Sequence, residues 1–157
     1  MRFMRPEAPD ETSLGKKHIE TTAVGDKIYD VEKLNQFAEA LPEETLPLDS
    51  FTEAIDEDHT YWIDQEGNPL GPADILRDWQ RAQENPAWAE HIAIIRGANL
   101  NRPIWIHKES RQVINGVHRL TRAFLDGLPE IKAKVFENLP DSAIVSRREP
   151  GDRDNPA

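Results

Sequence analysis

Residues 103–136 read PIWIHKESRQVINGVHRLTRAFLDGLPEIKAKVF, and this stretch decides the fold. Two runs rich in β-branched and aromatic residues come first, at 103–106 and 112–114. The polar run 108–111 between them predicts that the two strands form a hairpin. The last run, 131–136, alternates apolar residues with lysines, as a strand with one buried face does. We therefore expect three strands of one sheet within this stretch.

A helix is predicted between the hairpin and the last strand. Leu120, Ala123 and Phe124 have helical spacing and fall on one face. Gly116 lies just before this segment and Gly127 just after it. A glycine in the left-handed conformation often ends a helix, because it has no Cβ to clash with the preceding turn. The stretch thus predicts a strand, a sharp turn at Gly116, a helix and a final strand.

The upstream residues add further helices and short strands. Asp30 can accept hydrogen bonds at the start of a helix that Pro42 ends. The four tryptophans, Trp62, Trp79, Trp88 and Trp105, are expected in the core or an interface because of their large apolar area. The other expected elements are a first strand in 45–51, a strand at 61–63 that turns at 66–69, a helix from 72 to 82 and a helix from 88 to 95.

The fold class predicted from these elements is α+β, a small mixed sheet with packed helices. A chain of 157 residues has room for one domain of ordinary size. We expect the domain at 27–139, because the ranges 1–26 and 140–157 are polar and lack a sustained apolar period. These two ranges are predicted to be mobile tails.

Composition excludes several classes of function. The chain has no cysteine, which rules out disulfides, thiolate nucleophiles and cysteine-ligated metals. No apolar run approaches the roughly 20 residues that cross a bilayer, and residues 1–22 lack the apolar stretch of a secretory signal. We expect a cytoplasmic protein with no membrane partner. The formal net charge of -10 disfavours sequence-independent binding to nucleic acid.

A local anion site is nevertheless compatible with this charge. A strand that delivers Asn115 and Gly116 into a helix places unpaired amides and the positive end of the helix dipole at one point. His118 and Arg119 follow at once and can donate to phosphate oxygens. Thr121 and Arg122 complete the predicted phosphate-binding set.

The same residues carry a resemblance to a known family. The runs 103–106 and 113–123 resemble the ParB/sulfiredoxin superfamily, which has a Pro-Ile strand, a hairpin, an acid-glycine turn, a basic pair and a following alanine. Upstream pieces from Asp30 onward are similar to small ParB-like proteins of this superfamily, including a histidine at the place of His91. The resemblance extends from about Asp30 to Phe136 and implies a phosphate-binding loop at Gly116 to Arg119.

The resemblance also implies a nucleotide ligand, ATP, ADP or CTP, held with Mg²⁺. The chain differs from the pattern of this superfamily at two positions that bear on the chemistry. Asn115 stands where many relatives have aspartate, and an amide is a poor general base. Val117 stands where sulfiredoxins have their cysteine, so the sulfiredoxin reaction is excluded. No room remains after Phe136 for the DNA-binding domain of a complete partition protein.

Three functions stay open. The first is a magnesium-dependent phosphotransferase or nucleotide hydrolase in which Asn115 and His118 serve the reaction and Glu57 or Asp58 supplies a base. The second is a binding or regulatory module without catalysis. The third is a DNA-binding or nuclease-like protein. For His91 a hydrogen bond within the packing is favoured over a ligand contact, and no spacing of histidines and acids predicts a metal ligand set.

Overall fold

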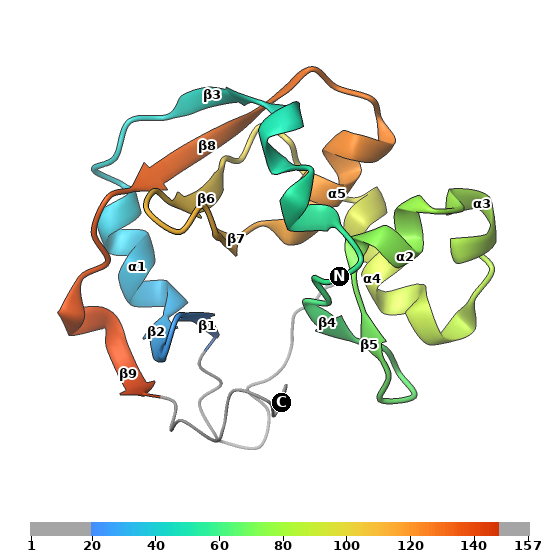
Figure 1. The fold of residues 1–157 in the computed structure, drawn as a ribbon, viewed down its shortest axis with the longest axis horizontal. Helices are drawn as coiled ribbons and strands as arrows, with labels where there is room; N and C mark the ends of the chain where they lie inside the picture. The colour runs from blue at the N-terminus through green and yellow to red at the C-terminus, as the bar shows by residue number, and fades with distance from the viewer. Residues whose placement is uncertain (1–19, 148–157) are drawn as a thin grey trace. The chain divides into compact units, whose positions relative to one another are not determined.

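The computed structural model describes residues 20–147 of the chain (Figure 1). These residues divide into two compact units, one made of 20–37 and 140–147, the other of 38–139. Both combine strands with helices, so the α+β class is confirmed. No helix in the described part is long and apolar enough to cross a membrane.

The first unit holds a three-stranded antiparallel sheet. Its order is β1 (Thr21–Val24), β2 (Lys27–Asp30) and β9 (Ile144–Arg147), with the short 3₁₀ helix Asp141–Ala143 before β9. The strands β1 and β9 lie within the ranges predicted to be tails, so that prediction is wrong for these residues. Both segments pair with the backbone of β2, and each contains two apolar and two polar residues. The rest of the predicted tails, 1–19 and 148–157, lies outside the described residues.

Helix α1 (Val31–Ala38) follows β2 without a loop. One carboxylate oxygen of Asp30 accepts the N–H groups of Glu32 at 2.8 Å and of Lys33 at 3.3 Å. The predicted cap is thereby confirmed, because this carboxylate satisfies amides that have no partner within the helix.

The second unit is built around a four-stranded mixed sheet. The strand order is β3 (Glu44–Pro47), β8 (Glu130–Phe136), β6 (Ile104–His107) and β7 (Val113–Asn115). Strands β6 and β7 form the predicted antiparallel hairpin, and β6 pairs with β8 in parallel. Helix α5 (Val117–Leu125) makes the crossover, and its buried residues Leu120 and Ala123 join a core with Ile104, Ile106, Ile131 and Ala133.

The predicted strand 45–51 is only half correct. Strand β3 ends at Pro47, and a 3₁₀ helix, Leu48–Phe51, follows. The hydroxyl of Ser50 donates to the carbonyl of Pro47 at 2.7 Å and stabilises this turn. Leu48 and Phe51, three residues apart, both enter the core, and this spacing suits a 3₁₀ turn better than a strand.

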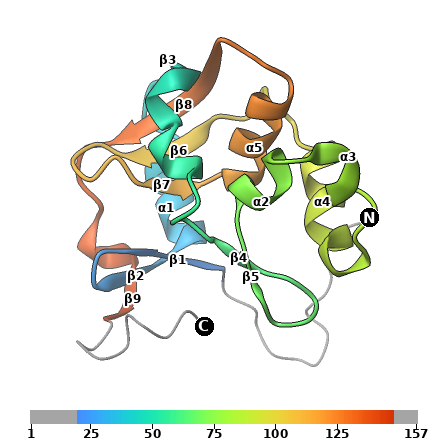
Figure 2. The same ribbon diagram turned by 45° about the vertical axis from the view of Figure 1, so that its right-hand side comes forward.

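Short helices form the other side of the second unit. The hairpin β4 (Trp62–Ile63) and β5 (Pro69–Leu70) leads into α2 (Pro72–Leu76), α3 (Trp79–Ala82) and α4 (Ala89–Arg96). Their core contains Leu70, Ile75, Ile92 and Ile95, against which Trp62, Trp79 and Trp88 pack as predicted. In Figures 1 and 2, α5 lies between these helices and the four-stranded sheet.

The helix predicted over 72–82 is two helices. Asp78 has extended backbone angles, φ -156° and ψ 90°, which interrupt the helical path. Its carboxylate accepts the N–H of Arg81 at 3.1 Å and begins α3 anew. An aspartate side chain in this position can bond a backbone amide in place of a helical carbonyl, and here that bond replaces the continuous helix.

Candidate anion-binding site

A pocket of about 380 Å³ lies where α4 ends and α5 begins. Ile94, Gly97 and Ala98 form its apolar side. Gly116 lines it where β7 passes into α5. The polar side chains that line it are two amides, one imidazole and two guanidinium groups, from Asn99, Asn115, His118, Arg102 and Arg119.

Gly116 forms the sharp turn that the sequence predicts. Its φ of 103° lies in the left-handed region. A Cβ at this position would stand 2.7 Å from Cγ2 of Ile104, so the backbone approaches β6 more closely than any side chain permits. The carbonyl of Gly116 accepts the N–H of Leu120 at 2.9 Å as the first bond of α5. The amides of the turn before it have no carbonyl to bond within the helix, and the helix dipole is positive here.

The two arginines of the pocket have different roles. Nη1 of Arg119 donates to the carbonyls of Pro103 at 2.7 Å and of Arg102 at 3.2 Å. This side chain therefore fixes the segment that enters β6. The side chain of Arg102 is exposed and makes no ion pair with any residue between 20 and 147. The sequence places the anion contact on Arg119, and this contact stays a prediction, because Arg119 also lines the pocket while its Nη1 bonds the backbone. Arg102 lines the pocket beside it.

Two histidines and a tryptophan form a stack beside the pocket. Nδ1 of His91 and Nε2 of His118 are 3.0 Å apart, and Nε2 of His91 lies 3.2 Å from the carbonyl oxygen of Ile63. The imidazoles are 12° from coplanar with centroids 5.2 Å apart, as two rings hydrogen-bonded edge to edge would be. Both lie over the indole of Trp62, with centroids 4.4 Å away for His118 and 5.0 Å for His91.

His118 is neutral at physiological pH. Burial, together with the neighbouring His91 and Arg119, lowers the pKa of its imidazole to about 3. The imidazole therefore acts in the pocket as a hydrogen-bonding group and adds no positive charge. The positive charge at the pocket comes from the guanidinium groups.

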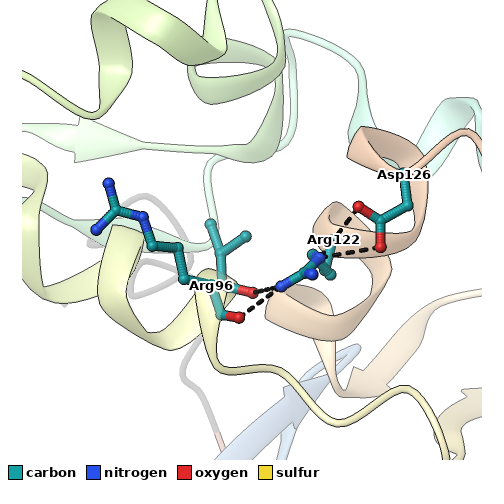
Figure 3. A network of polar contacts seen from close by, with 4 residues as sticks. Arg96, Arg122 and Asp126 are labelled. Carbon is teal, nitrogen blue, oxygen red and sulfur yellow. Dashed lines mark hydrogen bonds and ion pairs between the residues drawn. The ribbon is translucent and has the colours of Figure 1, made fainter.

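Two residues of the predicted phosphate-binding set do not line the pocket. Thr121 is fully buried, and its hydroxyl donates to the carbonyl of Val117 at 2.8 Å. Arg122 holds Asp126 through Nε, at 3.1 and 3.0 Å from the two carboxylate oxygens. Its Nη1 donates to the carbonyls of Ile95 and Arg96 at the end of α4 (Figure 3). Thr121 thus bonds within α5, and Arg122 joins α5 to the end of α4 from outside the pocket.

The two predicted acids also lie elsewhere. The carboxylate of Glu57 is exposed and stands 3.8 Å from the guanidinium of Arg77. Asp58 is exposed, and its N–H donates to the carboxylate of Asp56 at 3.0 Å. Asp56 in turn contacts His59 at 2.8 Å, which lowers the pKa of this carboxyl group.

The pocket does not fit a magnesium ion. Mg²⁺ takes oxygen ligands and is usually held by one or two carboxylates, but the only side-chain oxygens of the pocket lining belong to the amides Asn99 and Asn115. Among residues 20–147 there is no group of three or more histidine or acidic side chains that could hold a metal ion. Of the predicted site, the structure therefore brings together Asn115, Gly116, His118 and Arg119.

The predicted site set did not include Asn99, Arg102 or Trp62. Arg102 belongs to the run 101–122, which has five basic residues and one acid, and this excess of positive charge was the sequence feature that pointed to it. The side chain of Asn99 accepts the N–H of Asn101 at 3.0 Å. Trp62 was predicted only as a core or interface residue. Comparison of the chain with family models, curated proteins and solved structures finds no match.

Proposed function

We propose that the chain is a nucleotide-binding module whose pocket at the start of α5 holds the phosphate groups. The observation that carries this proposal is the composition of the pocket. It combines the unpaired amides of a helix N-terminus with an exposed guanidinium at Arg102, and its lining includes no carboxylate that would repel an anion. The resemblance of 103–123 to the ParB/sulfiredoxin pattern supports a nucleotide as the source of the phosphate.

Binding without turnover is the version that the geometry supports best. Asn115 is no general base, the carboxylate of Glu57 lies near Arg77, and neither Glu57 nor Asp58 lines the pocket. Phosphoryl transfer depends on positioned charge, usually with a metal ion, and the pocket lining supplies neither a metal ligand set nor a base. The proposal therefore assigns recognition to this pocket and no chemical step.

Calorimetric titration with ATP, ADP and CTP, each with and without Mg²⁺, tests the proposal. We expect binding that Arg102→Ala weakens by about tenfold or more, because a charge-assisted hydrogen bond contributes about 1.5 to 3 kcal/mol. Arg102→Lys should restore only part of the affinity, since an ammonium lacks the planar fork.

Arg81→Ala is the matched control. Arg81 is an exposed arginine on α3 outside the pocket lining, so the change in net charge is the same. An equal loss of affinity in both variants would show that the loss comes from the change in net charge and not from a contact with Arg102. Absence of binding for all three nucleotides would overturn the proposal, and strong, steeply salt-dependent binding to DNA would replace it with the nucleic-acid alternative.

A further inference from the structure

The hydrogen bonds of the stacked histidines determine where their protons are. The carbonyl oxygen of Ile63 can only accept, so Nε2 of His91 carries a hydrogen. In the neutral ring the other nitrogen, Nδ1, is then an acceptor, and Nε2 of His118 must carry the hydrogen that joins the two rings. The same rule applied to His118 leaves its Nδ1 without a hydrogen.

Nδ1 of His118 is the ring nitrogen that remains available to a ligand in the pocket. His118 lines the pocket, His91 occupies its Nε2, and none of the described residues hydrogen-bonds its Nδ1. A bare nitrogen lone pair repels an oxyanion and attracts a hydroxyl hydrogen. Next to the amides of α5 and the guanidinium of Arg102, which favour an anion, the pocket thus contains one group that needs a hydrogen.

We propose that His91 is a positioning residue that keeps Nδ1 of His118 bare, so that the pocket binds its anion together with one proton. This inference rests on the proposed function and adds that the phosphate group binds together with one proton. The proton either arrives on a phosphate oxygen or comes from solvent and binds Nδ1 of His118. In the second case the Nε2 hydrogen can shift to Nδ1 of His91, and the two rings share one positive charge.

The surroundings of the pair allow this charge only when an anion is present. Arg119, on the same helix as His118, and Arg102, from the β6 entrance, are the charged groups that line the pocket with it. Both disfavour a further positive charge, and Arg119 together with burial and His91 keeps the pKa of His118 low. A bound anion reverses the local balance, and the face of Trp62 beneath both rings favours the cation.

Sulfate is the probe of choice, because this anion does not change its own charge between about pH 6 and about pH 8, where histidine pairs titrate. We expect its affinity, followed by the amide shifts of Gly116 and Val117 in NMR spectra, to rise as pH falls, approaching about tenfold per pH unit for one linked proton. Nitrogen-15 spectra of the ligand-free protein should show the hydrogen of His118 on Nε2.

Two variants of His91 separate positioning from mere packing. His91→Gln offers an amide that donates to Ile63 and an oxygen that accepts from His118, so the pH dependence should persist. His91→Ala frees the imidazole to carry its hydrogen on Nδ1, so sulfate should bind with little dependence on pH. A structural role alone would leave the pH dependence of the alanine variant as it is in the wild type.

Three results would overturn the inference. The first is a hydrogen on Nδ1 of His118 in the ligand-free wild type. The second is sulfate binding that is independent of pH in the wild type, which would leave the anion pocket of the proposed function standing. The third is absence of sulfate binding at every pH, after which the nucleotide titrations still test the proposed function separately. If His91→Ala does not fold, the spectra and the pH series of the wild type decide.

Discussion

The two ends of α5 make an instructive contrast. At its C-terminal end, Gly127 takes the left-handed conformation with φ 65°, and the N–H groups of Gly127 and Leu128 bond the carbonyls of Phe124 and Ala123. Arg122 and Asp126 bond each other there as well. At its N-terminal end, Gly116 is also left-handed, but the amides of the first turn and the guanidinium of Arg102 border a pocket.

This difference shows how a protein separates support from recognition on one short helix. The C-terminal groups satisfy one another, so they contribute to stability and leave little for a ligand. The N-terminal groups are held in position by others, chiefly Arg119, while polar groups remain directed at the pocket. The groups that a basic side chain on α5 already bonds therefore show whether it supports the fold or remains available to a ligand.

Replacing each terminal glycine by alanine should give the largest contrast. Gly116→Ala adds a Cβ 2.7 Å from Ile104 and 3.1 Å from Nη2 of Arg119, at a φ of 103°. Gly127→Ala meets nothing within 4 Å, so only the cost of its φ of 65° remains. We expect Gly116→Ala to lower the free energy of unfolding by about 3 kcal/mol and Gly127→Ala to lower it by about 1 kcal/mol. Urea denaturation measures both, and equal losses would show that the approach to Ile104 is not tight.

The arginines should divide stability and binding between them. Arg122→Ala removes the bonds to Asp126 and to the end of α4, and we expect a loss of about 2 kcal/mol in the free energy of unfolding. Arg102→Ala removes an exposed side chain and should change stability by less than about 0.5 kcal/mol while it weakens nucleotide binding. Thermal unfolding and calorimetry on the same two variants check this division. A stable Arg122→Ala protein would contradict the supporting role of that residue.

Local patterns account for the parts of the fold that were predicted correctly. One continuous stretch of sequence contains the β6–β7 hairpin, α5 and the glycines at both ends of α5. In this stretch the hydrophobic period, the turn residues and the helix caps all predict the same elements. Strand β9 was missed because its partner β2 lies more than a hundred residues away and three of its four residues are exposed, so no buried face marks it. A short strand of this kind is specified by its partner's backbone, which no local pattern reveals.

The candidate site was predicted only in its centre. Asn115 to Arg119 are consecutive, so a strand, a turn and a helix place them together. Thr121 and Arg122 were grouped with them by proximity in sequence, although their positions on α5 direct them to the core and to the end of α4. The contribution of Arg102 depends on the contact between Arg119 and its carbonyl, and the role of His91 depends on the packing of α4 against α5. Such tertiary contacts have no counterpart in the local pattern.

An effect smaller than those of Gly116→Ala and Arg122→Ala is a dependence of stability on pH that originates at the N-terminal end of α5. Burial, His91 and Arg119 lower the pKa of His118 to about 3 in the folded protein, against 6.5 for an unperturbed histidine. Between these values the unfolded chain binds the proton more strongly, so the free energy of unfolding falls as pH falls below 6.5.

Urea denaturation at about pH 7.5 and about pH 5.5 should therefore differ by about 1.4 kcal/mol, the equivalent of one pH unit below the unfolded pKa. The carboxyl groups whose pKa is lowered, Asp56 and Asp64, titrate below the ordinary aspartate pKa of 3.8 and leave this window unaffected. His118→Gln removes the titrating group and should abolish the difference. If the wild type kept the same stability at both pH values, the folded pKa of His118 would not be depressed, and the pocket at the N-terminal end of α5 would not contain a neutral imidazole at physiological pH.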